Sequence, residues 1–224
     1  NVYHTIQLIG ERQNWLTNYL KESEYPDLEY VGKYDEKSNY FEIVKDIRDS
    51  LKLPTNWASK MGTWEEALDY LTLQIEEIGI IVNFNGIVGN NTRRKIPVEE
   101  CRGFVLVNKK EKEIKMIEVK KKAPFLFINS ADAKAAQMFT LIHELAHIWL
   151  GESAGFDNQQ MLPANDPVEK LCDQIAAEFL VPELFLKEKW KDSKDIKYLS
   201  RVFKVSPIVI ARRCMDLNLI TKSA

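Results

Sequence analysis

Apolar residues recur three and four positions apart in the first third of the chain, which is the spacing of amphipathic helices. This pattern predicts helices over residues 5–22, 39–52 and 64–78. Thr63 and Glu66 have the spacing of a capping box, in which each side chain satisfies a free backbone donor of the first helical turn. Gly79 is placed to end that helix. The polar, Tyr-rich residues 24–38 predict a linker.

The period of the pattern changes after residue 79. Short runs of apolar residues, separated by Gly, Asn and Lys, predict four strands over residues 80–84, 103–108, 113–119 and 124–129. Lysines are concentrated between residues 109 and 122, at the ends and on one face of the third run. We interpret them as a solvated edge that resists aggregation, with a phosphate-binding patch as the alternative.

Helical spacing returns after the strands. It predicts helices over residues 131–150 and 168–181, and a C-terminal pair over residues 195–203 and 207–220. Ser130 is placed to cap the first of these helices and Gly151 to end it. Asp166-Pro167 and Ser206-Pro207 are typical helix starts, because proline loses no donor at the first helical position.

This order of elements predicts an α+β fold, in which a small, mostly antiparallel sheet packs with helices. The C-terminal pair, with its turn at Lys204-Val205, resembles a helix-turn-helix. We therefore divide the chain into an N-terminal helical and linker segment (1–60), a central domain (61–190) and a C-terminal segment (191–224).

Composition restricts the class of protein. The chain is 45% hydrophobic and 29% charged, which excludes a disordered chain, a collagen-like repeat and a disulfide-dense mini-protein. Its net charge of -2 argues against polyanion binding by the chain as a whole. The longest apolar runs are too short to cross a membrane, so we expect no membrane partner. Three widely spaced cysteines predict reduced thiols and a cytoplasmic location.

Two of the three histidines lie four positions apart, in the sequence His143-Glu144-Leu145-Ala146-His147. Residues four apart project from the same helix face, so both imidazoles can reach one metal ion. Glu144 lies beside the first histidine and can reach a water on that ion without being a ligand. The alternative, an amphipathic helix that carries two histidines by chance, is disfavoured because a buried histidine pair without a metal is costly to leave unsatisfied.

A third ligand is expected, because two histidines do not hold zinc tightly. The acidic candidates downstream are Glu152, Asp157, Asp166, Glu169, Asp173 and Glu178. Glu169 and Asp173 lie four apart on the next predicted helix, so Glu169 can bind the ion while Asp173 accepts the free ring N–H of a ligand histidine. The alternative for Glu169 is a solvated carboxylate in the first helical turn. Cys172 is interpreted as a buried apolar residue rather than a ligand.

The run HELAHIWL, followed by EKLCDQIAAEFLVP at 169–182, resembles the ImmA/IrrE family of zinc-dependent metallopeptidases. The upstream runs NNTRRKI, CRGFVLVN and FLFINSADAKAAQMFTL are similar to the same family, so the resemblance covers at least residues 80–182. The resemblance implies a zincin-like metallopeptidase domain over 61–190 with one Zn²⁺ per chain. The zinc ligands that it implies are His143, His147 and Glu169, with Glu144 as the general base.

The resemblance also implies an endopeptidase that cleaves a protein substrate, a repressor of the helix-turn-helix type in a phage-like or stress-response system. Where the family more usually has Ala-Asn in the second helix, this chain has Cys172-Asp173, and Asp173 keeps a side chain able to hold a ligand histidine. The developing oxyanion needs a donor besides zinc, and Arg102 and Tyr198 are the candidates, although we favour a structural role for each. Strand 103–108 or strand 124–129 is expected to offer an edge to an extended substrate backbone.

Residues 191–224 carry eight basic and three acidic side chains, in contrast to the acidic remainder of the chain. A DNA-binding role for this segment would use Arg212 and Arg213 on the second helix of the pair. We favour the alternative that the pair packs against the peptidase and helps to grip the substrate protein. A regulatory protein that binds a partner or DNA and has a vestigial zinc site is the second hypothesis, and an intact Glu144 argues against it.

Overall fold

The computed structural model describes residues 2–88, 91–107, 123–152 and 166–221. Its helices are α1 (Val2–Glu22), α2 (Tyr40–Ser50), α3 (Trp64–Glu77), α4 (Lys134–Leu150), α5 (Pro167–Leu180), α6 (Glu183–Asp192), α7 (Ile196–Phe203) and α8 (Pro207–Asp216), with a 3-10 turn at Trp57–Lys60. Its strands are β1 (Ile81–Phe84), β2 (Ile87–Val88), β3 (Asn91–Lys95), β4 (Gly103–Leu106) and β5 (Phe125–Ile128). None of the helices in these ranges is long and apolar enough to cross a membrane.

Three strands form a mixed sheet in the order β1-β5-β4, in which β5 is parallel to β1 and antiparallel to β4. The predicted α+β class is confirmed, with parallel pairing on one side of the small sheet. β2 and β3 form a separate antiparallel pair that the sequence pattern did not predict, because every residue of β3 is exposed and no apolar alternation marks it. The expected strand over 113–119 and the lysines between 109 and 122 lie outside the described residues.

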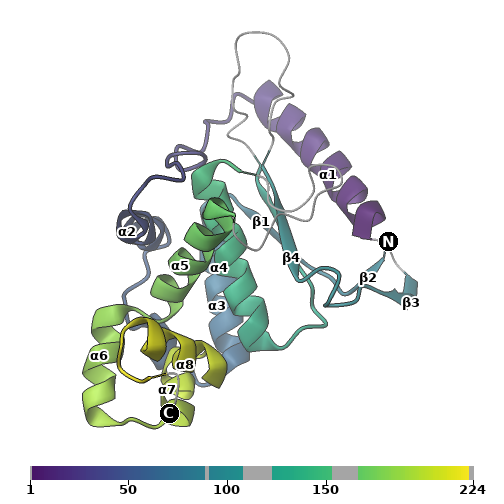
Figure 1. Cartoon of the computed structure of the whole chain (residues 1–224). Helices are drawn as coiled ribbons and strands as arrows, with labels where there is room; N and C mark the ends of the chain where they lie inside the picture. The colour runs from purple at the N-terminus through teal and green to yellow at the C-terminus, as the bar shows by residue number, and fades with distance from the viewer. Residues whose placement is uncertain (1, 89–90, 108–122, 153–165, 222–224) are drawn as a thin grey trace.

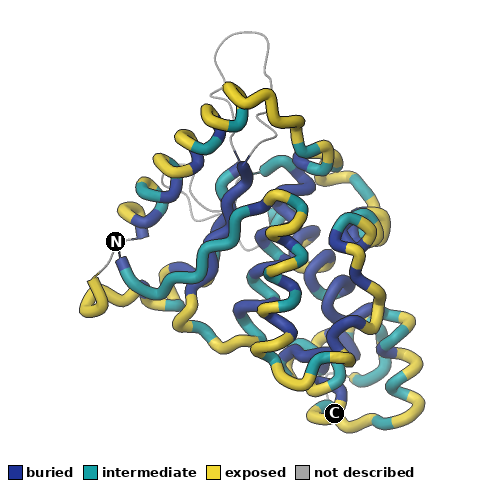
Figure 2. The backbone as a smooth tube through the Cα atoms, turned by 180° about the vertical axis from the view of Figure 1, so that it is seen from behind, coloured by how far each residue is buried: buried dark blue, intermediate teal, exposed yellow. Residues whose placement is uncertain are grey.

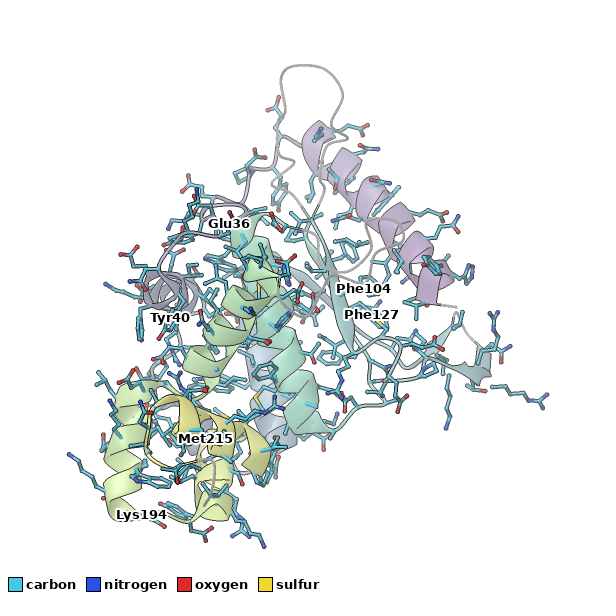
Figure 3. The ribbon with its side chains drawn as sticks, viewed as in Figure 1. Glu36, Tyr40, Phe104, Phe127, Lys194 and Met215 are labelled. Carbon is cyan, nitrogen blue, oxygen red and sulfur yellow. The ribbon has the colours of Figure 1, made fainter. Side chains whose placement is uncertain are left out.

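The two faces of the sheet are covered by different helices (Figure 1). Successive strand residues point to opposite faces, so Phe104 and Phe127 pack with α1 residues such as Ile9, whereas Val105 and Leu126 join the main core. The rings of Phe104 and Phe127 stack with 4.8 Å between their centroids (Figure 3). The sheet therefore holds α1 on one side and α4 on the other.

The main core surrounds α4. Leu141, Ile142, Leu145 and Trp149 of this helix have no exposed surface, and α4 packs against α5, β4, β5 and α3. Figure 2 shows the contrast with α1, along which buried and exposed positions alternate. A helix buried on most sides is held in place by packing around its whole circumference, which makes α4 a rigid support for functional side chains.

The segment predicted as a linker packs against the C-terminal end of α4. Val31 is 1% exposed, and the N–H groups of Gly32 and Tyr34 donate to the carbonyls of Ile148 and Trp149 over 2.9 and 3.0 Å. Tyr30 stacks on Trp149 with 4.5 Å between ring centroids. The linker prediction is therefore incomplete, because these residues supply hydrogen bonds to carbonyls that a helix end leaves free.

The helix caps agree with the sequence in most places. Thr63 accepts from the N–H of Glu66 over 3.1 Å, but the Glu66 carboxylate accepts from Gly62 rather than from Thr63. The predicted cap at Ser130 is wrong: α4 begins three residues later than expected, after Ala133, without a side-chain cap. The reason is a turn fixed by Asn129, whose side chain accepts from Ala131 N–H and donates to the carbonyls of Ile96 and Cys101.

The C-terminal helices begin close to the predicted positions, but α8 ends at Asp216, four residues before the predicted end at residue 220. α7 ends at Lys204, which adopts the left-handed conformation with φ of 54°, and Ser206 caps α8. α6 was not predicted, because only Leu186 of its ten residues is buried and its sequence has no clear apolar face.

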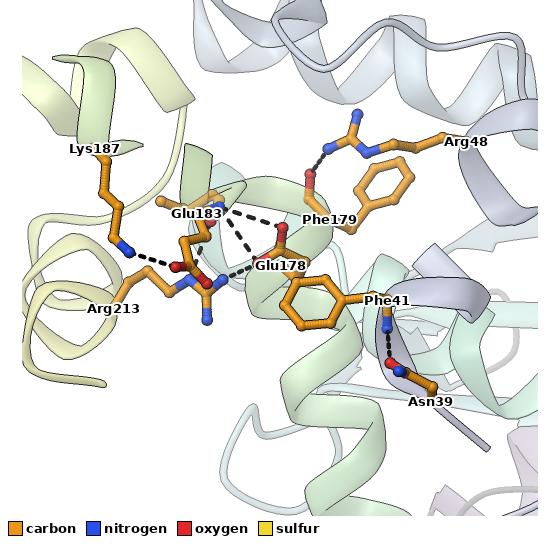
Figure 4. A network of polar contacts seen from close by, with 9 residues as sticks. Asn39, Phe41, Arg48, Glu178, Phe179, Glu183, Lys187 and Arg213 are labelled. Atoms are coloured by element: carbon orange, nitrogen blue, oxygen red, sulfur yellow. Dashed lines mark hydrogen bonds and ion pairs between the residues drawn. The ribbon is translucent and has the colours of Figure 1, made fainter. Parts of the chain in front are cut away.

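Buried arginines attach these helices to the rest of the molecule (Figure 4). Arg213 of α8 donates to the Glu178 carboxylate of α5 and, over 3.1 Å, to the carbonyl of Val181. Arg48 of α2 donates to the carbonyl of Phe179 at the end of α5. Helices α2 and α8 are thus both attached to the C-terminal end of α5.

Candidate active site

His143 and His147 project from the same face of α4 toward Glu169 in the first turn of α5. The Nε2 atoms of the two histidines lie 3.4 Å apart. One carboxylate oxygen of Glu169 lies 3.1 Å from His143 Nε2, and the other lies 3.5 Å from His147 Nε2. One donor atom from each residue lies within 4.8 Å of the other two, so the three side chains form a candidate metal centre.

The spacing of these donor atoms fits a small ion. Ligand atoms at about 2.0–2.1 Å from a tetrahedrally coordinated ion lie roughly 3.3–3.4 Å from one another. The two Nε2 atoms are 3.4 Å apart, as expected for two such ligands, and each lies within 3.5 Å of one of the two carboxylate oxygens of Glu169. Two imidazole nitrogens and a carboxylate oxygen also form a donor set that suits a borderline-soft divalent cation.

Glu144 follows His143 on α4, and it is 6% exposed. Burial raises the pKa of its carboxyl to about 7, an effect that the nearby His143 partly offsets. Its Oε2 atom is buried without a hydrogen-bond partner among the described residues. A buried acceptor of this kind is costly unless a donor reaches it, so this atom is suited to a water or a substrate N–H.

Asp173, one turn after Glu169 in α5, contacts the outer nitrogen of His143. The Nδ1 of His143 donates to Asp173 Oδ1 over 2.9 Å, which directs Nε2 toward His147 and Glu169. Burial alone would lower the pKa of His143, but the hydrogen bonds to Asp173 and Glu169 raise it to about 10. The hydrogen bond from His143 lowers the pKa of Glu169. The apposed carboxylates therefore hold the imidazole in one orientation.

The other acidic candidates for a third ligand have different surroundings. Asp166 caps α5 by accepting from Val168 N–H, and Glu178 pairs with Arg213. Glu152 lies just after α4 and does not belong to the cluster, and Asp157 lies outside the described residues. Cys172 has no exposed surface, and burial raises the pKa of its thiol. Of the described candidates, Glu169 is the one that lies with both histidines.

A cavity of about 540 Å³ opens beside His143 and Glu144. Its walls come from β4, α4, α5 and α8, and the residues that line it are Arg102, Gly103, Ala135, Ala136, Phe139, Thr140, His143, Glu144, Asp173, Ala177, Ser206, Ile208, Val209, Arg212, Arg213 and Asp216. Because His143 is one of the three residues of the candidate metal centre and lines the cavity together with Glu144, the cavity leads directly to that centre.

The two candidates for oxyanion stabilisation lie in different places. Arg102 precedes β4, lines the cavity and lies 3.6 Å from Asp132. Tyr198 lies on α7, is 42% exposed, and is not among the described residues that line the cavity. The structure therefore brings Arg102, but not Tyr198, to the same cavity as Glu144.

Sequence reasoning missed the contribution of α8 to the cavity wall. Ser206, Ile208, Val209 and Asp216 line it, although only the arginines of this helix were considered as functional residues. The sequence did contain a signal for this wall. Ile208 is a large apolar residue four positions before Arg212, so it lies on the polar side of the helix, and in the structure its side chain is 63% exposed. Phe139 and Thr140 of α4 also line the cavity and were not predicted to do so; Phe139 is apolar and has the helical spacing of a core residue.

This fold and this site define a class: an α+β protein whose helices α4 and α5 carry a candidate metal centre at the wall of a cleft. The chain belongs to the peptidase M78 family, since the family model described as IrrE N-terminal-like domain matches residues 90–215. The resemblance to the ImmA/IrrE family is thereby confirmed, and the family points to a peptidase acting on a protein substrate. No curated protein and no solved structure matches the chain.

Proposed function

We propose that the chain is a zinc-dependent endopeptidase. The observation that carries the proposal is the convergence of His143, His147 and Glu169 beside a buried Glu144 whose Oε2 atom has no hydrogen-bond partner among the described residues, in a member of a peptidase family. Three protein ligands that leave one tetrahedral position open are typical of catalytic zinc sites, whereas structural sites are closed by four.

The two histidines and Glu169 would hold the zinc ion. Zinc at such a site supplies Lewis acidity, which lowers the pKa of water toward neutrality and polarises a carbonyl group. Asp173 acts through His143, because its hydrogen bond to Nδ1 leaves Nε2 free to bind the ion.

Glu144 is the proposed general base and acid. Its buried carboxylate would take a proton from the attacking water and then deliver that proton to the nitrogen of the leaving amine. The adjacent cavity gives the peptide bond access to this carboxylate. Arg102 lines the same cavity and is the candidate donor to the developing oxyanion.

The substrate backbone is proposed to pair with β4. β5 is the central strand of its sheet, so the alternative of an edge at 124–129 is not available. β4 is the terminal strand among the described strands, and Gly103 at its start lines the cavity. An extended segment added to this edge would run past α4 and be held by main-chain hydrogen bonds.

The proposed biological substrate is a repressor of the helix-turn-helix type in a phage-like or stress-response system, processed in the cytoplasm. The cytoplasmic assignment is supported by the cysteines, since Cys101, Cys172 and Cys214 are all buried and free.

The test uses a synthetic library of randomised dodecapeptides, with cleavage products identified by mass spectrometry. We expect the zinc-loaded chain to cleave the library and a chelator to stop cleavage. Glu144→Gln should keep the fold and the zinc but abolish cleavage, because glutamine can still hydrogen-bond a water but cannot take its proton. His147→Ala should instead lose the zinc, measured by elemental analysis.

The two variants separate the roles of the residues. Normal cleavage by Glu144→Gln would exclude this residue as the base. Wild-type zinc content in His147→Ala would show that the metal site is misassigned. If the wild-type chain cleaves no peptide of the library and no helix-turn-helix repressor, the peptidase proposal is wrong and the hypothesis of a vestigial site replaces it.

A further inference from the structure

The cavity beside Glu144 follows one face of α4. Ala135, Ala136, Phe139, Thr140 and His143 line it, at positions that recur with the helical period and end at the metal site. Eight residues of helix span about 12 Å. An extended peptide of about three to four residues covers the same length. The cavity thus has room for a short substrate segment on one side of the scissile bond.

Helix α8 forms another wall of the cavity, and it contributes both apolar and charged side chains. Ile208 and Val209 are apolar, and the 63% exposure of Ile208 leaves its side chain accessible to a ligand in the cavity. Phe139 of α4 is half-buried and lines the same space. These side chains make part of the cavity suited to a large apolar group.

Arg212 adds a positive charge to this apolar wall. Its guanidinium is exposed and has no hydrogen bond or ion pair with any of the described residues. Its neighbour Arg213 is already neutralised by Glu178. Asp216, one turn further along α8, is the acidic side chain on the same wall. Arg212 is therefore the cation on α8 that is available to a ligand.

We propose that α8 is a specificity-determining wall of the peptidase. It selects substrate segments that carry a large apolar side chain, placed between Phe139 and Ile208, and an acidic side chain close by in sequence, placed against Arg212. The inference rests on the proposed function, since the ligand is the peptide that Glu144 cleaves.

The same placement argues against DNA as the ligand of this helix pair. In a helix-turn-helix the exposed face of the second helix enters the major groove. In this chain that face, with Ile208 and Arg212, is turned toward the cavity beside the candidate metal centre. A duplex could not reach these side chains without excluding the substrate.

The substrate preference is measured by digesting the dodecapeptide library with the zinc-loaded wild-type chain. The frequency of each amino acid is then determined at each position around the cleaved bonds. We expect enrichment of Leu, Ile, Phe or Met at one position and of Asp or Glu within three residues of it. Arg212→Glu should lower the relative rate for acidic peptides about three- to tenfold and raise that for basic peptides, since a surface attraction becomes a repulsion.

The matched control is Arg201→Glu. It changes the charge by the same amount on the neighbouring helix α7, where the side chain is exposed and does not line the cavity. Its cleavage profile should equal that of the wild type. Ala136→Leu, which adds volume to the opposite wall while keeping a good helix former, should shift the apolar preference toward Ala and Val.

Three outcomes would overturn the inference. A library that is cleaved without acidic or apolar preference shows that α8 does not select the substrate. An equal change in Arg212→Glu and Arg201→Glu shows a long-range effect of net charge. Salt-dependent binding of duplex DNA that Arg212→Glu abolishes, with an unchanged cleavage profile, assigns the helix to DNA. If the library is not cleaved at all, the proposed function itself has failed, which is a different result.

Discussion

The orientation of His143 depends on contacts at both of its ring nitrogens. Nδ1 donates to Asp173, and Nε2 faces Glu169 and His147. The side chain of Asp173 is 64% exposed, so solvent screens its charge and its main effect is geometric. Glu169 and Asp173 are one turn apart on α5, and this spacing allows one helix to contact both nitrogens of the same ring.

Replacing Asp173 tests this arrangement. Asp173→Ala leaves all three proposed ligands in place but removes the acceptor that orients one of them. We expect zinc affinity, measured by competition with a chelator, to fall about 10–100-fold, with secondary structure unchanged. Asp192→Ala is the matched control, since Asp192 has 60% exposure and pairs only with a lysine at the surface. Equal zinc affinity in the two variants would refute the role of Asp173.

At the scale of elements, the C-terminal end of α4 is completed by residues more than a hundred positions earlier in the chain. Gly151 adopts the left-handed conformation with φ of 66°, and it lies directly against Gly32, whose φ is 64°. A Cβ atom added to Gly151 would lie 2.8 Å from the Gly32 Cα. Both the conformation and the close approach of the two backbones require glycine at this position.

We predict that Gly151→Ala is destabilising and that Gly10→Ala is not. The left-handed conformation alone costs about 1–2 kcal/mol for a residue with a Cβ, and the contact with Gly32 adds to this. In α1, a Cβ on Gly10 meets only Leu106 Cδ1 at 4.0 Å, and alanine in a helix is favoured by about 1 kcal/mol over glycine. Chemical denaturation should therefore show shifts of opposite sign. Equal stability of the two variants would contradict the packing described at the end of α4.

At the scale of the whole molecule, the ion pair between Arg213 and Glu178 joins the C-terminal helices to the helix that carries Glu169. The side chains are 7% and 10% exposed, and Glu178 also accepts from the N–H of Glu183 at the start of α6. Because the pair is buried, its loss leaves a carboxylate with no compensating charge. This contact attaches α8 to α5 beside the cavity.

Arg213→Met should lower the free energy of unfolding by about 3–5 kcal/mol, since it breaks a buried ion pair and leaves one partner charged. The double variant Glu178→Gln/Arg213→Met should recover part of this loss, because glutamine is neutral and still accepts from Glu183. Urea denaturation of the three proteins measures the difference. A double variant less stable than Arg213→Met alone would show that the uncompensated carboxylate is not the cause.

The sequence by itself determined the features that depend on local spacing. The helical period placed His143 and His147 on one face of α4, and the same period placed Glu169 and Asp173 together on α5. Helix ends at Gly151, Asp166 and Ser206 were also predictable, because caps depend on residues a few positions apart.

The tertiary structure decided what depends on contacts between distant segments. The sequence could not choose between strands 103–108 and 124–129 as the terminal strand of the described sheet, since the order β1-β5-β4 is set by pairing across the sheet. It predicted residues 24–38 as a linker because their partner, the end of α4, lies far along the chain. It could not show that Ile208 and Arg212 face the cavity, because a helix's own period says which residues share a face but not which neighbour that face meets.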